Sequence, residues 1–221
     1  FDKASTVTVT SAEKVTVSDI DAAESATLDF TGVTGVLSVT TDSNNKYTIK
    51  GSSTAVNTII LGTTLNSDET ITAGSATTDK LTATIASLAN STSSTTGALN
   101  ISGVEYLEFD TATAASTISA ASITGVKEIA VGSGSDVTIE NLAAGVDVQA
   151  GVGADDSYKG DLTVKLADSS GSNDSLTYIL NERGTDDDVD GHLIGTGIET
   201  LTIKDEAAAG TDDDIELDIS G

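Results

Sequence analysis

Short segments in which apolar residues alternate with Thr or charged residues constrain the fold of this chain most strongly. This period of two is typical of half-buried β-strands, because successive side chains of a strand point to opposite faces. Gly, Ser, Asn and Asp, which favour turns, separate the segments. The sequence therefore predicts many short strands, of which the clearest cover residues 7–9, 15–17, 28–30, 37–39, 47–49, 81–85, 137–139, 162–164 and 215–219.

The interior of such a fold must be narrow and filled with aliphatic side chains. Aromatic residues make up only 3% of the 221 residues, and Trp, Met, Cys and Pro are absent. Stacked coils with an interior one or two side chains wide fit this composition better than a bulky aromatic core. The absence of Cys excludes disulfides, thiolate metal sites and a cysteine nucleophile.

One motif recurs and indicates stacked repeats. A small residue, an aliphatic residue and Glu or Lys precede an alternating strand in GVEYLEF at 103–109, GVKEIAV at 125–131, GIETLTI at 197–203 and, in degenerate form, SAEKVTV at 11–17. The first residues are separated by 92, 22 and 72 positions, which fits four, one and three units of about 22–24 residues, a typical solenoid coil. We therefore predict an all-β fold, a β-solenoid like a parallel β-helix, with tandem Ig-like β-sandwiches as the alternative.

A Ser/Thr-rich stretch at residues 90–96 is the candidate domain boundary. It would divide the chain into a β-rich segment at 1–97 and a second one at 98–221 that carries acidic loops of a calcium-binding type. Ser/Thr-rich loops also occur inside solenoids, so one continuous domain is the alternative.

The chain is strongly acidic, with 35 Asp and Glu against 10 Lys and Arg and a net charge of −25. Nucleic-acid binding requires clusters of Lys and Arg, which argues against such partners and against direct contact with anionic lipid. No apolar run is long enough to span a membrane, so membrane insertion is not expected. The charge instead favours solubility, cation binding or a basic partner.

Runs of Asp in the last third of the sequence predict calcium as a cofactor. Closely spaced carboxylates repel one another, and hard oxygen ligands favour calcium as the neutralising ion. In DDDVDG at 186–191, Asp186, Asp188 and Asp190 have the alternate spacing of the first half of a calcium loop. Gly197 occupies the twelfth position, where a complete loop has Glu, and a solvated acidic loop is the alternative.

Other acidic residues are weaker candidates for the same chemistry, with charged turns as the alternative. Asp168 and Asp174 flank a loop and are considered as residues that complete a site in three dimensions. The remaining predicted metal ligands are Asp155, Asp156, Asp212 and Asp214.

No catalytic constellation emerges from the sequence. His192 is the only histidine and Arg183 the only arginine, and their expected roles are a surface position and a structural ion pair. One His and no Cys exclude most nucleophile triads. We therefore predict that the chain is not an enzyme.

The copies SGVEYLEFD, TGVKEIAVG and GTGIETLTIKD, in a chain rich in Thr, Ala, Ser, Gly and Asp, resemble bacterial surface-layer (S-layer) proteins and related RTX-type secreted proteins. The run DSLTYILNERGTDDDVDGHLIGTGIETLTI at 174–203 is especially similar, and the resemblance covers roughly residues 98–221. AGVGADDSY at 150–158 matches the RTX nonapeptide only in its second and third glycines and its Asp. The resemblance implies a β-rich, often solenoid fold, export to the cell surface, calcium-dependent folding and assembly into a lattice or adhesive layer.

The expected function is that of a structural component of a bacterial cell-surface layer, secreted and self-assembling with calcium. The expected partners are copies of the same chain and calcium ions, and a cell-surface polysaccharide is a further candidate. A secreted adhesin or stalk module is the alternative, and a polysaccharide-active β-helix enzyme is the third hypothesis.

Overall fold

The computed structural model describes residues 5–20, 25–41, 46–65, 68–85, 99–111, 115–132, 136–152, 160–170, 174–180, 190–205 and 216–220, which form strands and turns. None of these residues forms a helix long and apolar enough to cross a membrane. By their contacts, they fall into two compact units. The first unit holds the described residues of Phe1–Thr84, Leu99–Leu107 and Ser122–Val126, and the second holds those of Ile85–Ala98, Glu108–Ala121 and Lys127–Gly221. The predicted boundary between residues 97 and 98 stays a prediction, because residues 86–98 lie outside the described part.

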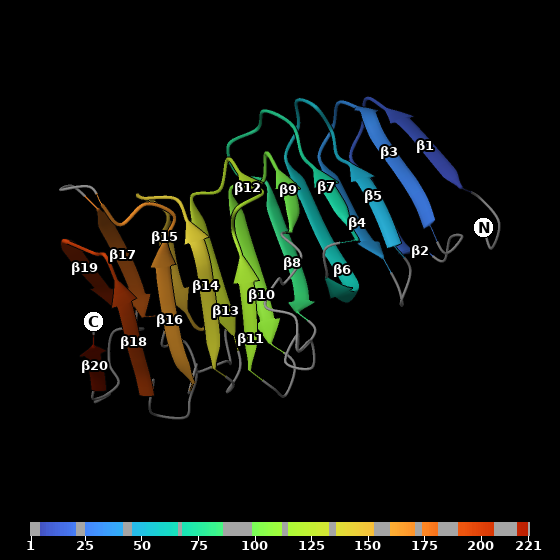
Figure 1. Ribbon diagram of the computed structural model, residues 1–221. Helices are drawn as coiled ribbons and strands as arrows, with labels where there is room; N and C mark the ends of the chain where they lie inside the picture. Colours follow the sequence, from blue (N-terminus) through green and yellow to red (C-terminus); the bar gives the residue numbers. More distant parts are fainter. Residues whose placement is uncertain are drawn as a thin grey trace, which may run out of the picture. The chain divides into compact units, whose positions relative to one another are not determined.

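The first unit contains two sets of strands that alternate along the chain (Figure 1). Sheet A is a parallel sheet of β1 (Thr6–Ser11), β3 (Ser25–Val33), β5 (Lys46–Lys50), β7 (Thr70–Thr72), β9 (Asn100–Ser102) and β12 (Ile123–Thr124). Between them in sequence come the strands of sheet B, which are β2 (Val15–Ile20), β4 (Leu37–Thr41), β6 (Asn57–Leu65), β8 (Lys80–Ile85) and the start of β10 (Tyr106–Thr111).

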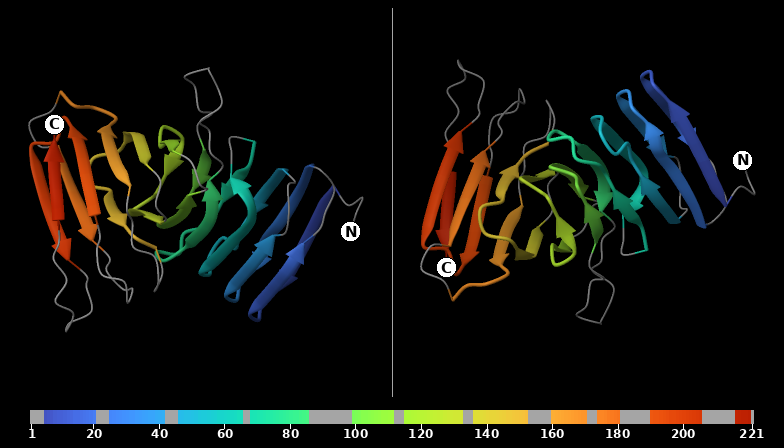
Figure 2. Two further views of the ribbon diagram at one scale, coloured as in Figure 1. Left: turned by 90° about the horizontal axis from the view of Figure 1, so that it is seen from below. Right: turned by 90° about the horizontal axis from the view of Figure 1, so that it is seen from above.

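The second unit repeats this alternation with a different partner sheet (Figure 2). Sheet C is a parallel sheet of β11 (Ser116–Ser119), β14 (Val137–Leu142), β16 (Asp161–Leu166), β18 (Asp190–Thr196) and β20 (Glu216–Ser220). The sheet B strands of this unit are β13 (Glu128–Gly132), β15 (Asp147–Ala150), β17 (Ser175–Leu180) and β19 (Thr200–Asp205), which are also parallel.

This arrangement confirms the predicted all-β solenoid. The strands pair in parallel, whereas Ig-like sandwiches are antiparallel, so that alternative is excluded. Eight of the nine segments predicted as strands fall wholly on strands, and the ninth, at 215–219, does so from residue 216, where the described part begins. Along the chain, sheet B advances by four strands from β2 to β10, by one to β13 and by three to β19, which matches the unit count predicted from the motif spacing.

The core of each unit is a set of columns in which residues from successive coils stack in register. In sheet A one column passes through every strand, from Val7 through Leu28, Ile49, Ile71 and Ile101 to Ile123. The residues of this column from Leu28 onward are at most 8% exposed. Full burial of an aliphatic side chain contributes about 1.5–3 kcal/mol, so the columns hold each coil to its neighbours.

Candidate functional site

Most of the predicted calcium ligands lie outside the described residues. These are Asp155, Asp156, Asp186, Asp188, Asp212 and Asp214. The backbone of Asp190 begins β18 and pairs in register with Glu216 of β20. In the described part of the chain, no group of three or more His, Asp or Glu side chains is placed to hold a metal ion. Calcium binding by the acidic runs therefore stays a prediction.

Asp168 and Asp174 have different structural roles. The Asp168 carboxylate is exposed and accepts hydrogen bonds from the Ser170 backbone N–H at 2.9 Å and hydroxyl at 2.7 Å. Both hydrogen bonds lower the pKa of Asp168, and the one from the Ser170 hydroxyl has the larger effect. Asp174, in contrast, is only 8% exposed, and its backbone N–H donates a hydrogen bond to the Glu199 side chain in the following coil.

Two pairs of one Asp and one Glu join neighbouring coils in the same way, and we call each an Asp–Glu clip. Both carboxyl groups are buried in the first clip, whereas Glu199 of the second is exposed. In the first, the Asp79 N–H donates to Glu105 Oε2 at 2.9 Å, while the Glu105 and Tyr106 N–H groups both donate to the Asp79 carbonyl at 3.1 and 3.0 Å. The Glu105 side chain thus accepts a hydrogen bond from the Asp79 N–H, in place of a backbone carbonyl of the neighbouring coil. A hydrogen bond to a charged group contributes about 1.5–3 kcal/mol.

The second clip, in the second unit, has the same three bonds. The Asp174 N–H donates to Glu199 Oε2 at 2.7 Å, and the Glu199 and Thr200 N–H groups donate to the Asp174 carbonyl at 2.9 and 3.1 Å. Glu105 and Glu199 are the third residues of two copies of the recurring motif. In these two copies, the motif therefore contains a turn, a strand and a Glu residue that forms a hydrogen bond to the preceding coil.

The glycine that opens each motif copy makes the corner before the strand. Gly103, Gly125 and Gly197 have φ values of +68°, +86° and +74°, a conformation that glycine adopts without strain. The corners also stack, since the Gly103 N–H donates to the Thr124 carbonyl at 3.0 Å. These three motif copies thus share a left-handed corner followed by an aliphatic residue, which is buried at Val104 and half-buried at Val126 and Ile198.

The first clip continues into a buried polar column. Asp79 is fully buried, and its Oδ1 accepts a hydrogen bond from the Asn57 N–H at 2.7 Å. The side chain of Asn57, also fully buried, accepts from the Ser52 N–H at 2.6 Å and donates to the Ser52 and Ala55 carbonyls. Asn57, Asp79 and Glu105 therefore supply bonds that the irregular corners of three successive coils require.

Burial raises the pKa of Asp79, and the nearby Glu105 carboxylate raises it further. Hydrogen bonds from Asn57 and Gly74 lower the pKa without reversing the shift. The second oxygen, Oδ2, is buried and has no hydrogen-bond partner among the described residues. Asp174 Oδ2 in the second clip shares this property.

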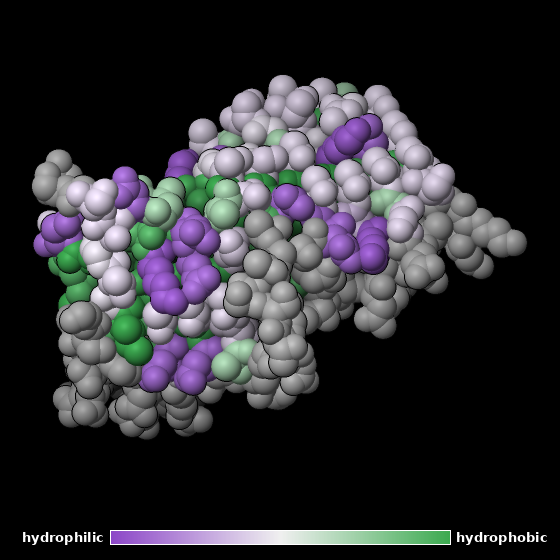
Figure 3. Space-filling model, in the orientation of Figure 1, coloured by the Kyte–Doolittle hydropathy of each residue, from purple (hydrophilic) through white to green (hydrophobic). Residues whose placement is uncertain are grey.

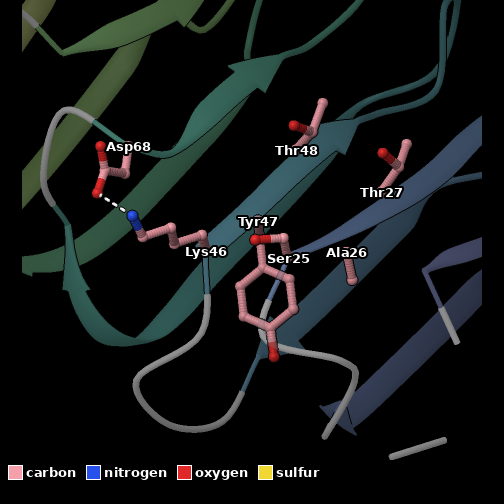
Figure 4. A pocket seen from close by; sticks show the side chains of 7 residues that line it. All are labelled: Ser25, Ala26, Thr27, Lys46, Tyr47, Thr48 and Asp68. Carbon is pink, nitrogen blue, oxygen red and sulfur yellow. Dashed lines mark ion pairs between the residues drawn. The ribbon is translucent and has the colours of Figure 1, made fainter. Parts of the chain in front are cut away.

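Thr and Ser side chains cover much of the outer face of sheet A, which Figure 3 shows mainly in pale lilac with separate purple charged residues. A shallow, open hollow of about 240 Å³ lies on the β3 and β5 side of this sheet (Figure 4). Its polar lining includes Lys46 and Asp68, which form an exposed ion pair at 2.6 Å. The other lining residues are Ser25, Ala26, Thr27, Tyr47 and Thr48.

The described lysines also neutralise part of the acidic surface. Lys165 pairs with Glu140 at 2.8 Å, and Lys204 pairs with Asp147 at 3.2 Å. Exposed pairs of this kind contribute about 0–1 kcal/mol each. They lower local repulsion more than they stabilise the fold.

The sequence alone did not indicate the Asp–Glu clips or the hollow. The recurring Glu in the third motif position was the available signal for the clips. Its partner lies 26 residues earlier in one clip and 25 in the other, without a motif of its own.

Comparison of the chain with protein-family models, with curated proteins and with solved structures gave no match.

Proposed function

We propose that this chain is a structural module of a bacterial cell-surface layer, exported and stabilised by calcium. The observation that carries the proposal is the use of the recurring motif for coil stacking. Its glycine makes the corner, the apolar residues of its strand are buried in the copies at 103–109 and 125–131, and in two copies its Glu closes a clip. A chain whose recurring motif serves coil stacking is suited to a load-bearing role.

The edge strands of the described sheets are the places where assembly with further copies is proposed. In the described part of the chain, β1 and β2 are the first strands of their sheets, and β19 and β20 are the last. Edge strands expose backbone N–H and C=O groups that pair readily with another chain. Parallel pairing of such edges would extend the stack.

The order of the strands supports calcium binding by the acidic runs. The run at 155–156 follows β15 in sequence, the run at 186–190 follows β17, and the run at 212–214 follows β19. These three strands are parallel neighbours, so their C-terminal ends lie at one edge of the sheet. Each run thus follows in sequence one of three neighbouring strands, which supports the proposal that calcium offsets the repulsion between the runs.

Calcium is expected to raise the melting temperature, and magnesium or a chelator is not. An ion that binds only the folded state at 100 times its Kd contributes about 2.7 kcal/mol per site, or roughly 5–10 °C for a domain of this size. Differential scanning calorimetry in calcium, in magnesium and in chelator measures the effect. The same melting curve in all three would refute the calcium proposal.

The Asp186→Asn and Asp188→Asn variants test whether calcium binds at the run of Asp residues at 186–190. If the run at 186–190 binds calcium, titration calorimetry should show lower affinity or a lost site in both. Asp29→Asn is the matched control, because Asp29 lies in β3, outside the acidic runs, and its carboxylate bonds only to the nearby Thr31 in the hydrogen bonds described. Unchanged calcium binding in the two variants would reject this assignment while leaving the other runs to be tested.

Assembly is expected to depend on calcium as well. Purified chain should form ordered arrays in calcium and disperse in chelator, as seen by negative-stain electron microscopy and light scattering. A sample that stays monodisperse in calcium would contradict the proposed role in a surface layer. If that sample bound cell-wall polysaccharide, the polar hollow on sheet A would support the adhesin alternative.

A further inference from the structure

We propose that Asp79 is a proton-binding site, which holds a neutral carboxylic acid in the folded protein under mildly acidic conditions that leave exposed aspartates ionised. The proposal is independent of calcium binding and of assembly. It rests on the surroundings of one side chain inside the first unit.

The environment of Asp79 favours a neutral group. The side chain is fully buried, and its Oδ1 accepts a hydrogen bond from the Asn57 N–H at 2.7 Å. The further hydrogen bonds from the Asn57 side chain and the Gly74 backbone lower the pKa of Asp79 without reversing its upward shift. An ionised carboxylate would leave charge on Oδ2, which is buried without a hydrogen-bond partner among the described residues. Burial of a charge without a partner is costly, and a carboxyl group avoids this cost by binding a proton.

The charged neighbour of Asp79 acts in the same direction. The Glu105 carboxylate, which accepts the Asp79 N–H, is 8% exposed and repels a second negative charge. Lys80, the next residue, is half-buried and belongs to the opposite face of the strand by alternation. From β6, the packed neighbour is Asn57, which is uncharged.

The preceding coil has a neutral donor at the corresponding position. Asn57 lies two residues before the buried Ile59, as Asp79 lies two residues before the buried Leu81. The Asn57 amide both accepts and donates hydrogen bonds within its corner. A protonated carboxyl group has the same capacity, because one oxygen accepts and the other carries a proton to donate.

The sign of the effect on stability follows from linkage. A pKa that is higher in the folded than in the unfolded state contributes stability that is fully present below the unfolded pKa and is lost as pH rises through the folded pKa. Asp79 should therefore stabilise the first unit in acid and lose this contribution towards neutral pH. Asp29 and Asp168 should do the opposite, because hydrogen bonds from Thr31 and from Ser170, respectively, lower the pKa of each.

The test is a ¹³C NMR titration of the carboxyl carbons in the wild-type chain, from about pH 8 to about pH 4.5, above the isoelectric point near 4.1. The Asp79 resonance should titrate at a clearly higher pH than those of Asp29 and Asp168, which serve as internal controls. An Asp79 resonance that titrates no more than those of Asp29 and Asp168 down to the lowest pH would overturn the proposal. A shift of the Asp79 resonance on addition of calcium, without one for Asp29, would place a cation there instead and also overturn it.

Paired variants give an independent readout. The stability of wild type minus that of Asp79→Asn should fall as pH rises, because the variant lacks the proton site. The same difference for Asp168→Asn should rise with pH. Urea unfolding at several pH values measures both, and a difference for Asp79→Asn that is constant or rises with pH would contradict the proposal.

Discussion

Replacing Gly35 by Ala should destabilise the first unit by about 3 kcal/mol, because the added methyl group collides with the backbone of the preceding coil. A Cβ at Gly35 would lie 2.3 Å from the carbonyl carbon and oxygen of Glu13 and 2.7 Å from the Lys14 nitrogen. Neither contact can be relieved by turning a side chain. The coil would have to move, although it is held by the Thr34 N–H to Ser11 carbonyl bond at 2.8 Å.

Gly125→Ala is the matched control in the same unit. Gly125 has a φ of +86°, but a Cβ there would meet its nearest neighbours, in Gly103, at 3.4 Å, an ordinary contact. This variant therefore isolates the backbone strain, about 1–2 kcal/mol. Urea unfolding should rank Gly35→Ala as the more damaging change. If Gly125→Ala were equally or more damaging, close packing of the corners would not be what holds the coils together.

Glu105→Ala should lower the free energy of unfolding by about 2–4 kcal/mol. The change removes a charge-assisted hydrogen bond and leaves the Asp79 N–H without an acceptor in a buried corner. It also removes the repulsion between Glu105 and Asp79, so the loss should be smaller where Asp79 is ionised. Urea unfolding at neutral pH measures the change.

Two variants separate the clip from a general effect of charge. Glu105→Gln keeps an oxygen that accepts the Asp79 N–H, and it should recover most of the lost stability. Glu140→Ala removes an exposed ion pair with Lys165 and should change stability by about 1 kcal/mol or less. Equal losses in Glu105→Gln and Glu105→Ala would mean that the backbone bond to the Glu carboxylate is not the stabilising contact.

The strands were predictable because their signal is local. Alternation along residues 28–30 or 137–139 follows from the geometry of a single strand, whatever its neighbours are. The choice of a solenoid over a sandwich depended on two further features, the lack of aromatics and the spacing of the motif. Both describe the whole chain, and the parallel pairing confirmed the choice.

The clips were not predictable to the same degree. The motif marked Glu105 and Glu199 as recurring residues, yet their partners depend on how the coils stack. Coil length varies, since Glu128 pairs with Asp147, 19 residues later, while Leu162 pairs with Leu193, 31 residues later. A fixed repeat therefore does not identify Asp79 or Asp174 as the residue one coil back.

The sequence by itself determined the strand class, the narrow aliphatic interior, the acidic surface and the repeated motif, because these depend on composition and on contacts within a few residues. Only the tertiary structure decided which carboxyl groups are buried and what they bind. In the sequence, Asp79 is one acidic residue among 35. It differs from the others because coil stacking excludes water from its corner and places Glu105 against its backbone.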